Sequence, residues 1–320
     1  MKFAKETRPQ GVSLETADVL IEALPWIKNI TGKTVVIKYG GAAMVDKQLR
    51  EDVMSDIVLL KIIGVNPIIV HGGGNDISEV MDLYNIPVEF KNGLRVTTDE
   101  GMEVVRMVLM GKVNQELVES MNSHGNLAVG VSGIDAGTII AEQMDPDLGR
   151  VGKVTQINTL YLEDLIMDDY IPVVASLAMG EDGGYYNVNA DSVAGAIAAA
   201  IGAHKVIFLT DVEGLYEDFD DKESLISNIN LAELKKAVES EEISKGMIPK
   251  LKACIAALEA GVFRAHIVNG TVPHSIMLEL LTNLGVGTTM HSTDEAYDFD
   301  AHPLGNFAAK LTENQPSSTS

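Results

Sequence analysis

The sequence predicts an α/β fold with an open, mainly parallel central sheet. Short β-branched runs alternate along the chain with helical patterns, in roughly eight strand–turn–helix units. Two of the predicted strands run directly into glycine turns that are followed by helices. Proteins of this class form their ligand sites in the crevice beyond the carboxyl ends of the strands. We therefore expect the functional site at those two glycine turns.

The first elements follow from apolar patterns. Within residues 14–29 apolar side chains recur at helical intervals, which predicts an amphipathic helix ahead of the first strand. The β-branched run 34–37 and the apolar run 67–70 predict two buried strands, with a helix at 48–63 between them. Thr98 is a suitable cap for a helix over 98–124.

The rest of the chain continues the alternation until the pattern fades at His291. Strands are expected at 127–131, 138–141, 153–157, 171–175, 185–189, 205–209 and 265–268. Helices are expected at 160–168, 190–201, 231–240, 248–261 and 275–283. The β-rich middle predicts a covering flap or hairpin layer near a substrate. The polar tail, 301–320, is expected to be disordered towards its end.

Charge limits the class of ligand. The chain has 320 residues and a formal net charge of −22, so its surface repels nucleic-acid backbones and we expect no nucleic-acid partner. A nucleotide substrate remains compatible with this charge if the few cations are concentrated in one cleft. The positions of the lysines and arginines therefore indicate where a nucleotide could bind.

Apolar segments and cysteine content indicate a cytoplasmic protein without a membrane partner. The longest apolar run, 193–201, is rich in alanine and well short of the roughly 18 to 20 residues of a spanning helix. The first residues include no apolar stretch or cleavage site of a secretory signal. The single cysteine, Cys254, fits a reducing compartment and is expected to be a small buried group in a helix.

Two familiar phosphate-binding motifs are incomplete. Gly32-Lys33-Thr34 resembles the end of a P-loop, but Ile27 stands where its first glycine is required and the triplet precedes a strand. Gly72 and Gly74 fit the start of a dinucleotide fingerprint, but Ile77 occupies the third glycine position.

The two strand-end turns predict an anion site. They are Lys38-Tyr39-Gly40-Gly41 and His71-Gly72-Gly73-Gly74. Glycines allow backbone N–H groups to approach phosphate oxygens closely, and a following helix N-terminus favours an anion. Lys38, at the inner end of an apolar strand, either extends to water or faces a ligand.

Further polar residues extend this set. Lys250 opens a predicted helix after Pro249, where a cation opposes the helix dipole and needs a compensating negative group. Asp191 is either that group or a first-turn acid that stabilises its own helix. Arg95, Asn187 and Asn189 stand at strand or loop ends, where each is either a ligand contact or a local turn or cap residue.

In this order the motifs resemble those of the N-acetyl-L-glutamate kinases of the amino acid kinase family. The resemblance runs from about residue 20 to 290. It rests on six separated blocks, which are VIK38YGG, VHGGG74, GLR95VT, NVNAD191, LTD211VEGLY and GMIPK250.

The resemblance implies a three-layer α/β/α sandwich and a reaction. An N-terminal oligomerisation helix (1–30) would precede an acetylglutamate-binding lobe (31–200) and a nucleotide-binding lobe (201–300). The implied reaction is ATP-dependent phosphorylation of the γ-carboxylate of N-acetylglutamate, with Mg²⁺ held mainly by the phosphates and no metal ligands assigned to the protein. By this resemblance, Lys38 would contact the transferring phosphoryl group, Lys250 would stabilise the leaving group, and Asp191 would position both lysines. Backbone donors would come from Gly40, Gly41, Gly72, Gly73 and Gly74, and the substrate would be bound by Gly73, Gly74, Arg95, Asn187 and Asn189. The nucleotide would be bound by Lys38, Thr210, Asp211 and Lys250.

A further similarity concerns regulation. The segment Ala23-Leu24-Pro25-Trp26 within helix 14–29 resembles the interlacing N-terminal helix of the arginine-inhibited, hexameric branch of the family. His266, Glu279 and Gly287 resemble that branch's arginine site. The resemblance implies feedback inhibition by arginine and a homohexamer built as a trimer of dimers.

Two alternatives remain. A related enzyme of the same family would act on aspartate, glutamate, carbamate or a nucleoside monophosphate, although Arg95 with the two asparagines favours an acylated amino acid. A catalytically silent arginine or nucleotide sensor is the other alternative, although a sensor does not need two lysines that face a phosphoryl group.

Overall fold

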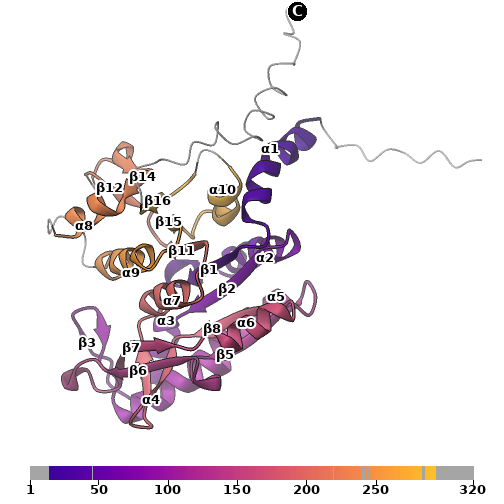
Figure 1. Cartoon of the computed structure of the whole chain (residues 1–320). Helices are drawn as coiled ribbons and strands as arrows, with labels where there is room; N and C mark the ends of the chain where they lie inside the picture. Colours follow the sequence, from indigo (N-terminus) through magenta and orange to yellow (C-terminus); the bar gives the residue numbers. More distant parts are fainter. Residues whose placement is uncertain are drawn as a thin grey trace, which may run out of the picture.

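The computed structural model describes residues 14–44, 46–218, 220–239, 243, 246–282 and 285–292. The start of the chain and the predicted polar tail, 301–320, lie outside these ranges. Eight strands form one sheet across the middle of the molecule (Figure 1). In spatial order they are β14 (Asn228–Asn230), β16 (Thr288–His291), β15 (Arg264–Asn269), β11 (Lys205–Thr210), β1 (Thr34–Tyr39), β2 (Asn66–His71), β8 (Ile171–Ala175) and β5 (Ala128–Ser132).

The sheet is mainly parallel, which confirms the predicted fold class. The six strands from β15 to β5 are parallel to their neighbours. At the other edge β16 pairs antiparallel with β15, and β14 pairs parallel with β16. The sequence pattern did not predict β14 or β16, because both are short strands at one edge of the sheet.

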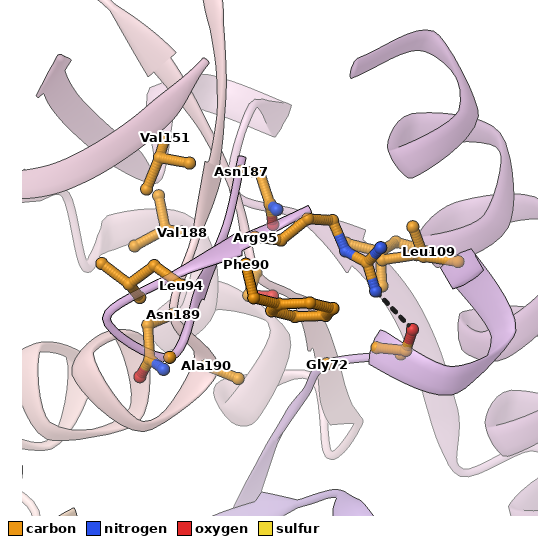
Figure 2. A pocket seen from close by; sticks show the side chains of 15 residues that line it. Gly72, Phe90, Leu94, Arg95, Leu109, Val151, Asn187, Val188, Asn189 and Ala190 are labelled. Atoms are coloured by element: carbon orange, nitrogen blue, oxygen red, sulfur yellow. Dashed lines mark hydrogen bonds between the residues drawn. The ribbon is translucent and has the colours of Figure 1, made fainter. Parts of the chain in front are cut away.

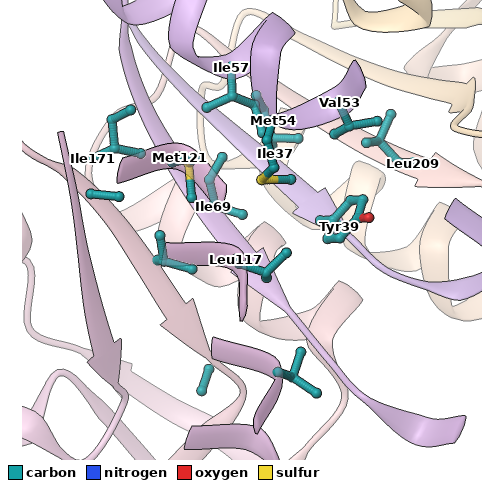
Figure 3. Packing of buried hydrophobic residues seen from close by; sticks show 14 of the residues in the cluster. Ile37, Tyr39, Val53, Met54, Ile57, Ile69, Leu117, Met121, Ile171 and Leu209 are labelled. Carbon is teal, nitrogen blue, oxygen red and sulfur yellow. The ribbon is translucent and has the colours of Figure 1, made fainter. Parts of the chain in front are cut away.

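Helices cover both faces of the sheet and form the outer layers. Alternate side chains of a strand point to opposite faces, so Val35 and Ile37 of β1 belong to one apolar core and Val36 to the other. Figure 3 shows part of the first core, where Met54 and Ile57 of α2 pack near Ile37 of β1. That core is covered by α2 (Lys47–Ile62), α3 (Gly74–Leu83), α4 (Asp99–Arg106), α5 (Gln115–Asn122) and α10 (Ser275–Leu281). The second is covered by α6 (Leu160–Met167), α7 (Ala190–Ala200), α8 (Leu231–Glu239) and α9 (Ile248–Glu259), in which Cys254 is buried as predicted.

The predicted long helix after Thr98 is one helical rod with an irregular centre. Thr98 caps it, since its hydroxyl accepts a hydrogen bond from Gly101 N at 3.0 Å. Between α4 and α5 lies η2 (Met107–Asn114), a π-helical segment that the sequence analysis did not predict. Four short 3₁₀ turns occur elsewhere in the described residues, at Gly41–Met44 (η1), Asp135–Gly137, Pro146–Leu148 and Lys222–Ser224.

Smaller β elements lie outside the main sheet. The predicted strands in the middle of the chain are present, and β9, which was not predicted, completes a closed group with them. This group contains β6 (Ile139–Gln143), β7 (Val151–Ile157), β9 (Leu177–Gly180) and β10 (Tyr185–Val188), and β10 leads into α7. Two short hairpins pair β3 (Phe90–Lys91) with β4 (Leu94–Arg95), and β12 (Leu215–Tyr216) with β13 (Leu225–Ile226).

The N-terminal helix α1 (Leu14–Ile30) packs beside α10 (Figure 1). Its start agrees with the prediction and its end differs by one residue. The side chains of Val19, Leu20 and Leu24 are exposed on it. Among the described helices, none combines the length and apolar character needed to cross a membrane.

Candidate active site

The two predicted glycine turns lie side by side at one edge of the sheet. Strands β1 and β2 are parallel neighbours, with Tyr39 opposite His71, so the turns that follow them leave the sheet together. The first turn continues into η1 and the second into α3. Gly41 has a φ of +72°, a left-handed conformation that glycine adopts without strain.

Asp191 brings the two predicted lysines together. Lys38 follows Val36 on the β1 face that α7 and α9 cover. Asp191 lies in the first turn of α7, and Lys250 lies in the first turn of α9. Lys38 Nζ is 3.0 Å from Asp191 Oδ1, and Lys250 Nζ is 3.1 Å from Asp191 Oδ2. One carboxylate therefore holds two cations that come from different elements.

The electrostatics of this group follow from its burial. Asp191 is 4% exposed and Lys38 is 9% exposed. Burial by itself raises the pKa of the Asp191 carboxyl, but the charges of Lys38 and Lys250 outweigh burial and hold this pKa below its ordinary value. The group is one anion with two cations, so it carries net positive charge in a chain of net charge −22. Such a group attracts an additional anion.

A cavity of about 180 Å³ lies next to the second glycine turn (Figure 2). It brings together the predicted substrate residues from three separate segments of the chain. Arg95 comes from the β3–β4 hairpin, and the ring of Phe90 in the same hairpin lies 4.8 Å from its guanidinium carbon. The predicted residues that line the cavity are Gly72, Gly73, Gly74, Arg95, Asn187 and Asn189.

The three polar side chains of this cavity differ in how they are held. Arg95 Nη2 donates to Gly74 O and to Ser78 Oγ, each at 2.7 Å, and the first bond is the dashed line in Figure 2. Asn187 Nδ2 donates to Thr97 Oγ1 at 3.3 Å. Asn189 Oδ1 accepts from Ser192 N at 3.1 Å, so Asn189 caps α7 while it also lines the cavity. For Asn189, the structure therefore shows the local cap role directly.

Thr210 and Asp211 stand at the same edge of the sheet as Lys38. Strand β11 is a parallel neighbour of β1, with Phe208 opposite Lys38, and Thr210 ends β11. The Thr210 hydroxyl donates to Asp211 Oδ1 at 3.2 Å. Neither residue lines the 180 Å³ cavity. The predicted nucleotide residues Thr210 and Asp211 are therefore separate from the cavity that holds the predicted substrate residues.

The three predicted effector residues form a separate buried group. His266 Nδ1 lies 2.7 Å from Glu279 Oε1, and Glu279 Oε2 accepts from Gly287 N at 3.1 Å. Thr289 Oγ1 also donates to Glu279 Oε1, at 3.0 Å. Burial lowers the pKa of His266 to about 4, so the imidazole is neutral at pH 7.

Sequence reasoning missed Lys205, which lies near this effector group. Lys205 begins β11 and is 5% exposed. Burial lowers the pKa of its ammonium group to about 8, with a further lowering by Arg264, while the charge of Glu279 raises it. Among the described residues, no carboxylate forms an ion pair with it. The only sequence signal was a lysine at the start of an apolar strand, which usually extends to water.

Comparison with known proteins identifies the family. The model of the amino acid kinase family matches residues 33–269, which is most of the chain. The chain belongs to the amino acid kinase family. A curated member named acetylglutamate kinase, from Caldanaerobacter subterraneus subsp. tengcongensis, is 50% identical over 91% of this chain and 97% of its own length. Another of that name, from Caldicellulosiruptor bescii, is 52% identical over 87% of this chain and 97% of its own length.

A solved structure supports the amino acid kinase fold. N-acetylglutamate synthase from Neisseria gonorrhoeae, complexed with coenzyme A and N-acetyl-glutamate, superimposes with a TM-score of 0.78 at 21% identity. The match covers 94% of this chain and 70% of the synthase chain. At this level of identity the likeness concerns the fold.

Removing the shared carboxylate should destabilise this family member. Asp191→Asn leaves two cations close together in a poorly hydrated place, so we expect the free energy of unfolding to fall by about 3 to 5 kcal/mol at pH 7. Asp168→Asn, at an exposed position, is the matched control and should change stability by less than about 0.5 kcal/mol. Urea unfolding measures both.

The contribution of Asp191 to the free energy of unfolding should decrease at low pH. Because the folded-state pKa of Asp191 is depressed, its contribution is present above about pH 4 and declines as the pH falls through the folded value.

Adding Lys250→Met to Asp191→Asn removes the repulsion between the two lysines and should restore part of the stability. An Asp191→Asn protein as stable as the unmodified protein would contradict the ion-pair account.

Proposed function

We propose that this chain transfers the γ-phosphoryl group of ATP to the γ-carboxylate of N-acetyl-L-glutamate, producing N-acetyl-L-glutamyl 5-phosphate for arginine biosynthesis. The observation that carries this proposal is the pairing of Lys38 and Lys250 with Asp191, beside a cavity that is lined by glycines and by Arg95. Support also comes from relatives named acetylglutamate kinase that are about half identical along nearly the whole chain.

The chemistry needs alignment and charge neutralisation more than proton transfer. A γ-carboxylate oxygen attacks the γ-phosphorus, an O–P bond forms, and the bond to the β-phosphate oxygen breaks to release ADP. The attacking carboxylate is already ionised at neutral pH, so no general base is required. Lys38 contacts the transferring phosphoryl group and Lys250 stabilises charge on the ADP side. Mg²⁺ accompanies ATP, is held mainly by its phosphates, and neutralises part of their charge.

Substrate placement follows the residues of the cavity. The guanidinium of Arg95 and the carboxamide of Asn187 bind the α-carboxylate and the acetamido group, and the glycine turns supply N–H donors to the phosphoryl oxygens. The lobe at 31–200 thus binds acetylglutamate, while the lobe at 201–300, with Thr210 and Asp211, binds the nucleotide. Asp191 fixes both lysines at the boundary between the two lobes.

A substrate panel tests this proposal. Purified protein with MgATP should release ADP with N-acetyl-L-glutamate, because Arg95 and Asn187 recognise both ends of an acylated amino acid. Glutamate, aspartate, carbamate and nucleoside monophosphates should give little or no ADP above background. Activity on glutamate but not on N-acetylglutamate would favour another amino acid kinase activity, and ATP turnover with none of them would favour a sensor.

We further propose that arginine inhibits the enzyme and that the chain forms a hexamer as a trimer of dimers. The effector group of His266, Glu279 and Gly287 supports the first part, together with buried Lys205, because arginine carries a cationic guanidinium and an anionic carboxylate. The exposed apolar residues of α1 support the second part, since a second subunit can cover them. Both features adjoin α10, which carries Glu279 and packs against α1.

Arginine sensitivity and mass in solution test this part together. Millimolar arginine should reduce the rate of ADP release, and the mass in solution should be six times 34.3 kDa. Glu279→Gln removes the charge that attracts the guanidinium and should raise the arginine concentration needed for half inhibition by about tenfold or more. A dimer that is indifferent to millimolar arginine would contradict both claims and leave the catalytic proposal untouched.

A further inference from the structure

The π-helical segment η2 packs directly beneath the second glycine turn. A π turn is rare and is commonly found at functional sites. Here Leu109 and Val113 of η2 are buried against Gly73, where an added Cβ would lie 2.9 Å from Leu109 and 3.1 Å from Val113. Glycine at position 73 therefore allows the turn to rest on η2, so the position of the turn depends on this segment.

Asn114, the last residue of η2, links that segment to the strand end. It is completely buried, and its Nδ2 donates to Val173 O at 2.8 Å and contacts His71 Nε2 at 3.0 Å. Because a carbonyl oxygen only accepts, the group that faces Val173 is the NH₂ of the carboxamide. The Asn114 side chain can lie this close to β5 only because residue 130 is glycine, since an added Cβ there would lie 2.0 Å from Asn114 Oδ1.

This contact fixes the tautomer of His71. Since Asn114 donates to Nε2, that nitrogen carries no proton, and the proton of the neutral ring is on Nδ1. Nδ1 lies 2.9 Å from Gly72 O, so it donates to this carbonyl. Burial lowers the pKa of His71 to about 4, in agreement with a neutral ring at pH 7.

The bond to Gly72 O has a consequence on the other side of the peptide. The carbonyl of Gly72 and the N–H of Gly73 belong to one planar trans peptide and point in opposite directions. Holding the carbonyl against His71 therefore turns the Gly73 N–H away from the ring. In the described part of the chain, no protein group accepts a hydrogen bond from the N–H of Gly73, and Gly73 lines the cavity.

We propose that His71 and Asn114 are positioning residues for phosphoryl transfer, which hold the Gly72–Gly73 peptide with its N–H directed at the phosphoryl oxygens. This inference rests on the proposed function for the identity of the anion. Neither side chain touches the substrate, and both act through the peptide.

Two substitutions separate positioning from packing. In His71→Asn the side-chain NH₂ takes the place of Nδ1–H and can still donate to Gly72 O. In His71→Gln the side-chain oxygen takes the place of Nε2 and can still accept from Asn114, but the donor to Gly72 is lost. We expect His71→Asn to keep kcat within about tenfold and His71→Gln to lower kcat by about 10²-fold, with little change in KM for N-acetylglutamate. Thermal unfolding of both variants should be similar.

A second measurement does not depend on activity. The ¹⁵N spectrum of the histidine side chains should show a neutral ring protonated on Nδ1 at pH 7, assigned to His71 by its loss in His71→Asn. An Nε2-protonated or charged His71, or equal kcat values for the two variants, would overturn the inference. If the unmodified protein instead failed to phosphorylate N-acetylglutamate while His71 showed the expected tautomer, the proposed function would fail and the peptide-holding role would stand.

Discussion

The arrangement of this molecule depends on one buried carboxylate shared by two lysines. Asp191 attracts Lys38 from β1 and Lys250 from α9, and without it two cations would stand close together in a poorly hydrated place. A chain with net charge −22 repels nucleotides in general, so a local excess of positive charge is needed where phosphates must bind. The ion pairs provide this excess and also fix its geometry.

The fold delivers the three partners to one place. The period-two alternation of β1 directs Lys38 to the face covered by α7 and α9, and both helices present their first turns to that face. The parallel sheet places the turns after β1 and β2 at the same edge. Side chains thus supply positive charge from one direction and backbone N–H groups supply donors from another, which suits a phosphoryl group with several oxygens.

Much of the fold and of the candidate site could be predicted from the sequence, because strand ends and glycine turns have clear local sequence patterns. A β-branched run followed by Lys38 and two glycines marks both the strand and the position of the lysine. That Asp191 contacts both lysines depends on tertiary packing, since residues 38, 191 and 250 are far apart along the chain. Asn189 was assigned to the substrate, and the structure shows that its oxygen also caps α7.

Other features of the structure cannot be recognised from the sequence pattern. The η2 segment is apolar on most sides, so its pattern fits an ordinary buried helix and does not show the π turn that brings Asn114 to His71. Strands β14 and β16 are three and four residues long, too short for periodicity to be detected. A lysine at the start of an apolar strand usually extends to water, and only the packing around β11 shows that Lys205 is buried.

The most direct test of the shared-carboxylate account is the turnover of Lys250→Ala with MgATP and N-acetyl-L-glutamate, beside Lys252→Ala as an exposed control on the same helix. The account predicts that kcat falls by about 10²- to 10³-fold for Lys250→Ala, with KM for N-acetylglutamate changed by only a few-fold. The control should remain fully active. Turnover by Lys250→Ala within a few-fold of the unmodified enzyme would contradict the role of the second lysine.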